Sequence, residues 1–291
     1  MTIDSTKHDY LPTDSPTPVL LYTVTLQLKG TNIANAQKWH ILEMSFRFSN
    51  AILTVVIMSG PGTIKKERNR LSLMDAKNFE SHVLSKTYTE IQQRYIGFDD
   101  PAHGWEHIQR VYRLALYIAE RESADPFIVG MAALMHDIGH LSIDKTQHHT
   151  DLSSSMASEL LTTCNVPADM REAILHAIAA HSFSLGIEPR TLEAKVVRDA
   201  DRLDSLGAIG ILRWAVTGAV RRTSDTQTYH PDDPFAEWHA LDDRRYLLDH
   251  FFTKLLKLNK TMSTQAGSAL AEQRMAFMHI YLDEFRGELE I

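Results

Sequence analysis

The chain has 291 residues, of which 44% are hydrophobic and 23% are charged, and its formal net charge is -7 at pH 7. This length allows one large domain or one domain with an extension, and the composition predicts a sizeable core. The negative charge argues against a broad nucleic-acid-binding surface. Cys164 is the one cysteine, so no internal disulfide and no thiolate-based zinc site can form.

Neither export nor membrane insertion is predicted from the sequence. The first twenty residues contain acidic side chains and three prolines, and they lack the apolar core of a signal peptide. The longest apolar run, 51–58, is far shorter than the roughly 20 residues that span a bilayer. We therefore expect a cytoplasmic protein with no membrane partner.

Residues 1–73 form an N-terminal extension whose sequence differs from the remainder. Its first 19 residues are polar and without periodicity, which predicts disorder. The segments 20–28 and 51–58 are rich in β-branched residues and favour strands, whereas the charged stretch 65–70 is typical of a linker. Met74 could be an alternative start. We expect an irregular, partly β extension that is poorly ordered or weakly structured.

Residues 74–291 show helical periodicity and predict an all-α domain. A first helix is expected over about 75–95. The next helix carries one inward face formed by His107, Val111, Leu114 and Ile118. Asp125 is a suitable N-cap, and Pro126 fits the first position of a helix that ends at Gly139. Further helices are predicted over 153–164, 168–181, 192–203, 209–220, 244–258 and 265–288.

Several residues that can bind metals lie on these helices. His107 shares its helix face with apolar residues, although a lone histidine there is more often part of the core than a ligand. His136 and Asp137 are adjacent inside an apolar stretch. Burying that carboxylate costs several kcal/mol unless a cation or hydrogen-bond donors offset the loss of water. This pair therefore favours a divalent metal.

A second acidic group consists of Asp199, Asp201 and Asp204. The sequence does not show which of these aspartates would bind a metal. Asp199 and Asp201 are about 200° apart on a helix, so one metal cannot bind both without distortion. Asp201 and Asp204 share a face. Periodicity does not choose between them, and a solvated acidic face paired with Arg198 and Arg202 is the plainer alternative.

Four of these residues occur in the order H…HD…D, as His107, His136, Asp137 and Asp201. In this pattern the chain resembles the HD-domain metal-dependent phosphohydrolase superfamily over about residues 80–288. Further segments resemble its YedJ-like group: 107–111, 176–184, 193–203, 206–210, 249–251 and 254–258. The resemblance implies a multi-helix bundle around a metal held by these four residues. Asp201 is preferred over Asp199 because it occupies the final aspartate position of the family.

The resemblance implies hydrolysis of a phosphoester or phosphoanhydride bond in a small metabolite, with a nucleotide as the leading class, by metal-activated water. Asp137 is the expected catalytic residue, since its carboxylate could accept a proton from that water. Mn²⁺ or Mg²⁺ is the expected metal, with Fe²⁺, Ni²⁺ or Co²⁺ as alternatives.

Arg110, His181 and Lys254 are expected to bind the substrate, because phosphate groups require cationic or hydrogen-bonding partners. Arg110 could equally be a surface residue paired with Glu106 or Glu120. Lys254 shares a basic face with His250 and Lys257, for which ordinary solvation is the plainer alternative.

Additional histidines keep other functions open. His103, His140, His148 and His149 lie near the metal-binding segments and leave a dinuclear site open. The alternatives are a mixed-valence di-iron oxygenase and a catalytically silent metal-dependent nucleotide sensor. A homo-oligomer also stays open, with residues 1–73 as a candidate dimer contact.

Overall fold

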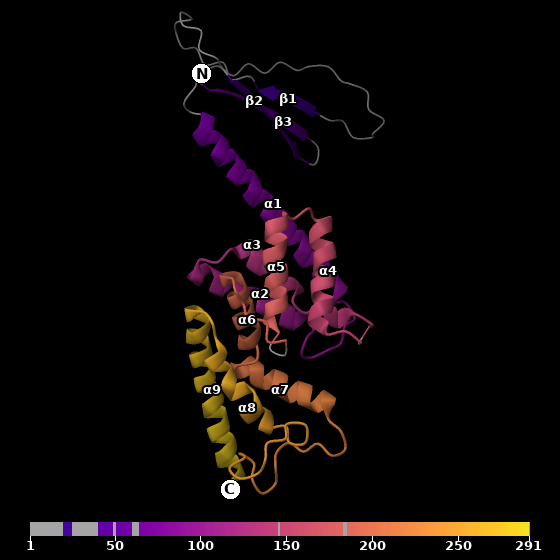
Figure 1. Ribbon diagram of the computed structural model, residues 1–291, viewed down its shortest axis with the longest axis vertical. Helices are drawn as coiled ribbons and strands as arrows, with labels where there is room; N and C mark the ends of the chain where they lie inside the picture. Colours follow the sequence, from indigo (N-terminus) through magenta and orange to yellow (C-terminus); the bar gives the residue numbers. More distant parts are fainter. Residues whose placement is uncertain are drawn as a thin grey trace, which may run out of the picture. The chain divides into compact units, whose positions relative to one another are not determined.

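The computed structural model describes residues 20–24, 40–48, 51–59, 64–144, 146–182 and 185–290, with side chains from residue 74 onward (Figure 1). The chain divides into two compact units, residues 1–79 and 80–291. The disorder predicted for residues 1–19 lies outside the described residues.

The first unit contains a three-stranded sheet in the order β1-β3-β2, formed by β1 (Leu20–Val24), β2 (His40–Phe48) and β3 (Ala51–Ser59). β1 is parallel to β3, whereas β2 is antiparallel to β3. β1 and β3 occupy the two segments for which strands are predicted. β2 was missed, although its sequence HILEMSFRF alternates apolar and polar residues from Leu42 onward, with the period of a strand.

Helix α1 (Ile64–Arg94) is longer than predicted, because it includes the charged stretch 65–70 and crosses position 73/74. Lysine, glutamate and arginine are good helix formers, so charge alone did not indicate a linker there. Within the second unit, Val83, Thr87 and Ile91 follow one another at four-residue intervals and are buried. This face anchors the C-terminal part of α1 to the core.

Residues 80–290 form the predicted all-α domain. Its helices are α2 (Trp105–Glu122), α3 (Pro126–Met135), η1 (Ile138–Leu141), α4 (His149–Thr163), α5 (Ala168–His181), α6 (Leu192–Leu203), α7 (Gly207–Arg221), α8 (Asp249–Thr253), η2 (Leu255–Thr261) and α9 (Gln265–Leu289). η1 and η2 are 3₁₀ helices. No single helix in the described part of the chain is long and apolar enough to cross a membrane; only the bent pair α6 and α7 passes by length and composition.

Helix α3 lies at the centre of this domain and contacts α2, α5 and α6. Almost all of its side chains are buried, which explains why its sequence is apolar on every face. Asp125 caps it as predicted, accepting hydrogen bonds from the backbone N–H groups of Phe127 and Ile128 over 2.8 and 3.2 Å. This cap fixes where α3 begins.

The chain leaves α3 at Met135, earlier than the predicted end at Gly139. His136 and Asp137 form a turn before η1, which frees their side chains from helical spacing. A Cβ atom at Gly139 would overlap the backbone of His149 and Ser153, so the glycine allows α4 to approach closely. The turn and the close approach at Gly139 together bring the start of α4 next to His136 and Asp137.

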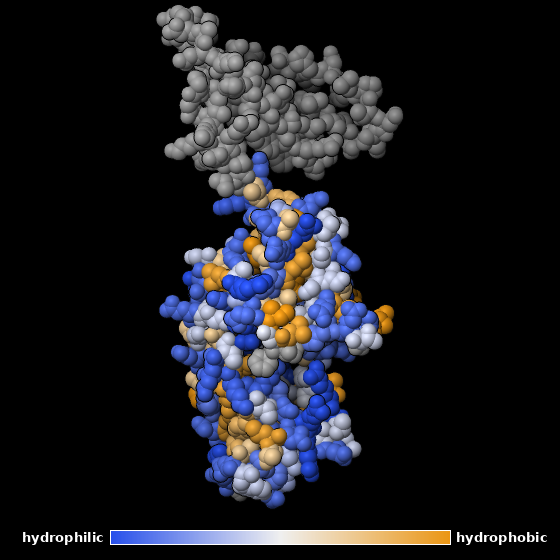
Figure 2. Space-filling view, in the orientation of Figure 1, coloured by the Kyte–Doolittle hydropathy of each residue, from blue (hydrophilic) through white to orange (hydrophobic). Residues whose placement is uncertain are grey.

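The C-terminal helices differ most from prediction. The expected helix over 244–258 is wrong: the chain is irregular up to Leu248, and only the short α8 and η2 follow. Asp233 and Asp249, both buried, flank the ring of His239 and organise this irregular segment. Helix α9 contacts α6, α7 and η2 (Figure 1). The face in Figure 2 is largely hydrophilic over the described residues, with smaller apolar patches.

Candidate metal centre and the adjoining pocket

The four predicted ligands come together from α2, α6 and the turn after α3. His107 Nε2 lies 3.3 Å from His136 Nε2, 3.5 Å from Asp137 Oδ2 and 3.4 Å from Asp201 Oδ1. His136 Nε2 lies 3.4 Å from Asp137 Oδ2 and 3.8 Å from Asp201 Oδ1. Two imidazole nitrogens and two carboxylate oxygens therefore converge on one small volume.

The histidine rings are oriented by hydrogen bonds on their far sides. Nδ1 of His107 lies 2.7 Å from Asp204 Oδ2, and Nδ1 of His136 lies 2.8 Å from the carbonyl oxygen of Ala133. Because Nδ1 donates in these bonds, Nε2 is the ring atom that faces the centre, and it presents a lone pair to a cation when the ring is neutral. This arrangement fits a divalent cation that accepts nitrogen and oxygen ligands.

Burial and charge prepare the same residues for a cation. Burial lowers the pKa of His136 to about 4, so its ring is neutral at pH 7. Burial opposes ionisation of Asp137, but the histidines around it outweigh this effect and hold its pKa well below the usual range. The same balance of burial against His136 and His107 lowers the pKa of Asp201. Both carboxylates are therefore ionised at neutral pH.

The four residues differ in exposure. The side chain of Asp201 is 28% exposed, whereas those of His107, His136 and Asp137 are at most 5% exposed. Beyond Asp137, the side chains of His140 and His149 are 21% and 29% exposed, so solvent reaches residues on both sides of the centre.

The second oxygen of Asp137 faces a different group of histidines. Oδ1 lies 3.4 Å from His181 Nε2, 3.8 Å from His140 Nε2 and 3.9 Å from His149 Nε2. Among the described residues, two further sets could hold a metal: His103, Asp137 and His140, or Asp137, His149 and His181. Burial lowers the pKa of His140 to about 4, so this ring is also neutral. Asp137 thus stands between two clusters of potential ligands.

Asp199, which periodicity could not exclude, lies outside the centre. Its carboxylate accepts hydrogen bonds from the backbone N–H groups of Ser263 and Thr264 and from the hydroxyl group of Thr264. It therefore ties α6 to the start of α9. Since Asp199 and Asp204 are almost completely buried, the alternative of a solvated acidic face is wrong for these two residues.

Asp204, which periodicity did not separate from Asp201, contacts the centre through His107 rather than facing it directly, and the sequence analysis did not predict this contact. It accepts hydrogen bonds from Arg110 Nε and Nη2 over 2.7 and 3.0 Å, and Arg213 Nη1 lies 2.9 Å away. Arg110 therefore pairs mainly with Asp204, and its contact with Glu106 is longer at 3.8 Å. The sequence signal was the position of Asp204, one turn after Asp201 on the same helix face.

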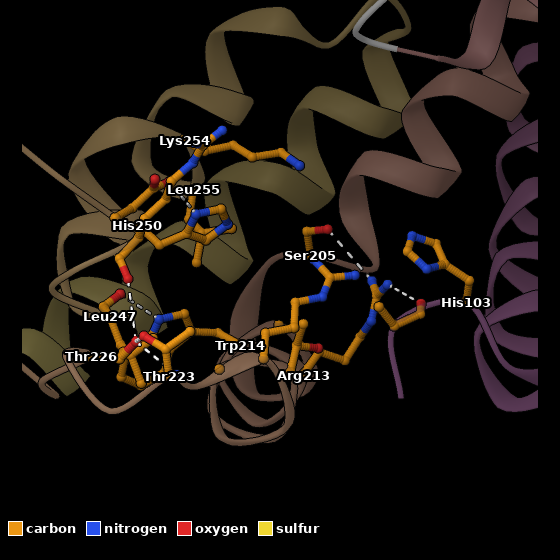
Figure 3. Close-up of a pocket in the computed structure, with 17 residues that line it drawn as sticks. His103, Ser205, Arg213, Trp214, Thr223, Thr226, Leu247, His250, Lys254 and Leu255 are labelled. Atoms are coloured by element: carbon orange, nitrogen blue, oxygen red, sulfur yellow. Dashed lines mark hydrogen bonds and ion pairs between the residues drawn. The ribbon is translucent and has the colours of Figure 1, made fainter. Parts of the chain in front are cut away.

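A pocket of about 580 Å³ adjoins the centre (Figure 3). His103, which belongs to one of the possible ligand sets, lies on one side, and Lys254 lies on the opposite side with Ser205 and Arg213 between them. Its cationic side chains are Arg213, Arg221, Arg244 and Lys254. Lys254 thus lines this pocket, whereas His181 belongs to the buried centre.

The pocket has an excess of positive charge. Arg221, Arg244 and Lys254 form no ion pair with any residue that the structure describes. The acidic lining residue Asp243 is paired with His250, whose Nδ1 lies 2.8 Å from Asp243 Oδ2. Unpaired cations around a concave surface favour an anionic ligand.

Comparison with known proteins places this geometry in a family. Residues 104–206 match the HD domain family. The chain is 36% identical over 185 residues to the uncharacterized protein YpgQ of Bacillus subtilis strain 168, an alignment that covers 62% of this chain and 81% of YpgQ. The finer YedJ-like grouping stays a prediction.

Solved structures agree with this assignment. The crystal structure of Bacillus subtilis YpgQ in complex with ADP is similar with a TM-score of 0.56 and 32% identity, covering 72% of this chain and 96% of that chain. An HD-superfamily hydrolase from Bacillus thuringiensis is similar with a TM-score of 0.57 and 31% identity, covering 72% and 98% of the two chains. The chain therefore belongs to the HD-domain superfamily of metal-dependent hydrolases.

Proposed function

We propose that this protein is a metal-dependent phosphohydrolase that cleaves a phosphoester or phosphoanhydride bond in a small metabolite, with nucleotides as the leading substrate class. The observation that carries the proposal is the convergence of His107, His136, Asp137 and Asp201 beside a cationic pocket. The ADP bound to the related YpgQ supports the choice of nucleotides.

We assign these four residues as ligands of one divalent ion, Mn²⁺ or Mg²⁺ in the first place, with Fe²⁺, Ni²⁺ or Co²⁺ as alternatives. When bound, such an ion would acidify a water molecule and polarise a phosphoryl oxygen. The chain contributes the fixed ring orientations of His107 and His136 and the two ionised carboxylates. Asp201 is the most exposed of the four residues.

Asp137 is the proposed catalytic residue. Its carboxylate is ionised and buried, and its two oxygens face two groups of imidazoles. A carboxylate in this state can accept a proton from attacking water, and the neutral ring of His140 lies near enough to receive it. His181 lies next to this carboxylate rather than in the distal pocket.

The pocket would hold the part of the substrate that does not react. Lys254, Arg221 and Arg244 lack ion-pair partners among the described residues and are suited to phosphate oxygens. We assign Arg213 rather than Arg110 as the arginine that faces the ligand, because Arg213 lines the pocket and Arg110 does not, although both pair with Asp204. Binding energy from these contacts would orient the scissile bond at the centre.

One observation favours a second candidate, a mixed-valence di-iron oxygenase. Asp137 presents Oδ2 to His107 and His136 but Oδ1 to His181, His140 and His149, an arrangement suited to a carboxylate shared by two metals. An oxygenase would contain two iron ions per chain and consume oxygen. A catalytically silent sensor would show neither turnover nor oxygen consumption.

The test is a panel of nucleotides and phosphate esters incubated with the Mn²⁺-loaded protein, with Asp137→Ala as the parallel variant. The proposal predicts release of phosphate or pyrophosphate by the wild type and loss of nearly all release in the variant. Absence of release from the metal-loaded wild type across the whole panel would reject it. Oxygen consumption by the iron-loaded protein would then favour the oxygenase.

A further inference from the structure

Asp204 joins the metal centre to the pocket through a single carboxylate. It is 1% exposed at the C-cap of α6, and the side chains that donate to it come from α2 and α7. Arg110 Nε lies 2.7 Å and Arg213 Nη1 2.9 Å from its oxygens, and Nδ1 of His107 lies 2.7 Å away. Its carboxylate therefore stands between the centre and the pocket.

One oxygen of Asp204 serves both regions. Oδ2 lies 2.7 Å from Nδ1 of His107 and 2.9 Å from Nη1 of Arg213. On the other side of the His107 ring, Nε2 faces Asp137 and Asp201. On the other side of Asp204, Arg213 lines the cationic pocket. A single oxygen thus fixes the position of a proposed metal ligand and of a pocket cation.

Arg213 has little freedom apart from this contact. Its Nη2 donates to the carbonyl oxygen of Ala102 over 2.5 Å, and its Nη1 contacts Asp204 Oδ2 at 2.9 Å and, more weakly, Ser205 Oγ at 3.5 Å. Arg110 and Arg213 share the carboxylate of Asp204, and Arg110 also lies 3.8 Å from Glu106. Of the two arginines, only Arg213 lines the pocket, so its charge is the one that an anion there would meet.

We propose that Asp204 is a positioning residue that orients His107 for the metal and Arg213 for an anionic group of the ligand. The proposal of a metal centre is its premise, but it does not require that the substrate be a nucleotide. Removing the charge of Asp204 should weaken both metal binding and anion binding, whereas removing Arg213 should weaken anion binding alone. Carboxylate partners of metal-bound histidines typically contribute about 10- to 100-fold in metal affinity.

The test uses calorimetric titration of the full-length protein with Mn²⁺ alone and with inorganic phosphate alone. For Asp204→Asn we expect the Kd for Mn²⁺ to rise about 10- to 100-fold and the Kd for phosphate to rise as well. For Arg213→Gln we expect a higher Kd for phosphate and a Kd for Mn²⁺ within about threefold of the wild type, because only the pocket loses a cation.

Asp199→Asn is the matched control, since Asp199 is another buried aspartate on α6 whose partners lie at the start of α9. It should leave both Kd values unchanged. Unchanged Mn²⁺ binding in Asp204→Asn would overturn the proposal, as would an equal loss in Asp199→Asn. If Asp204→Asn does not fold, Arg213→Gln decides: unchanged phosphate binding overturns the proposal, and selective loss supports it.

Turnover separates this proposal from the proposed function. If a phosphorylated substrate is found, Arg213→Gln should raise its KM more than it lowers kcat, because the arginine binds a part of the substrate that does not react. If no substrate is turned over, the proposed phosphohydrolase function is rejected. The titrations with Mn²⁺ and with phosphate still test the role of Asp204.

Discussion

Asp199 and Asp201 lie two residues apart on α6, and their carboxylates contact different parts of the molecule. Asp201 Oδ1 lies 3.4 Å from Nε2 of His107, whereas Asp199 accepts hydrogen bonds from the backbone at Ser263 and Thr264. The backbone geometry of a helix separates the two side chains, so Asp201 lies in the proposed metal centre and Asp199 stabilises the fold.

This separation predicts opposite phenotypes for two similar substitutions. Asp201→Asn should lower Mn²⁺ affinity at least about tenfold and abolish most activity with little loss of stability, because it removes one ligand. Asp199→Asn should lower the free energy of unfolding by about 1–3 kcal/mol, because its buried donors lose a charged acceptor, and it should keep Mn²⁺ affinity. Chemical denaturation and calorimetry check both results. Loss of Mn²⁺ affinity in Asp199→Asn alone would reverse the assignment.

Metal affinity should rise with pH through the range above 6.5. Burial lowers the pKa values of His107 and His181, but hydrogen bonds to nearby aspartates outweigh it and raise both above 6.5, so protons occupy these rings near neutral pH. His136, with a pKa of about 4, contributes no proton there. A metal binds neutral imidazole and must displace the protons.

We therefore expect Mn²⁺ binding to release protons at pH 7, with a Kd that falls by up to about tenfold per pH unit for each proton displaced. Calorimetry in buffers of different ionisation enthalpy measures the release directly. A Kd independent of pH between 5.5 and 8 would contradict the expected protonation of the empty site.

The cationic pocket predicts a salt-dependent effect on substrate binding. Exchanging Arg221 and Lys254 for glutamine should raise the KM for a phosphorylated substrate about tenfold with a smaller change in kcat, because these side chains contact the non-reacting part. The difference from the wild type should shrink at high ionic strength. Exchange of Lys260 for glutamine is the control, because this lysine does not line the pocket. An unchanged KM would place the substrate elsewhere.

His239 organises the irregular segment 233–249, part of which lines the pocket. Its ring lies between Asp233 and Asp249, with Nδ1 2.9 Å from Asp233 Oδ2 and Nε2 3.0 Å from Asp249 Oδ2. Burial acts to lower the pKa of His239, but the two aspartates outweigh it and raise that pKa. A raised pKa in the folded state means that this stabilisation is complete below pH 6.5 and is lost as the pH rises through the raised value.

His239→Ala should therefore lower the thermal unfolding temperature by several degrees at pH 6 and by less at pH 9. Because the segment supplies Asp243, Arg244 and Leu247 to the pocket, KM should rise while Mn²⁺ affinity is retained. Thermal denaturation at both pH values and a Mn²⁺ titration check this. Equal destabilisation at the two pH values would show that the protonated ring is not the stabilising form.

The sequence was sufficient for elements that local chemistry determines. The Asp125 cap, the inward face with His107 and the apolar α3 follow from local patterns, and the structure confirms them. Leu114 on that face is only half-buried but packs against the core. Predicting that Asp201 joins His107, His136 and Asp137 required the family resemblance. Spacing along α6 did not show which of its three aspartates belongs with them.

The remainder depended on tertiary contacts. At the start of α8, Asp249 accepts hydrogen bonds from His239 and from the backbone N–H of Asp242, contacts that hold the preceding segment out of a helix and that helical periodicity does not reveal. The contact of Asp204 with Arg213 likewise joins α6 to α7 and could not be read from either helix alone. A one-turn spacing after Asp201 was the only signal for Asp204.

The most direct test of the account measures nucleotide hydrolysis by chelator-treated protein before and after addition of one equivalent of Mn²⁺. We predict no hydrolysis before addition, restored hydrolysis in the wild type afterwards, and no restoration in Asp201→Asn. Hydrolysis that survives complete metal removal, or equal restoration in Asp201→Asn, would contradict a reaction centred on these four residues.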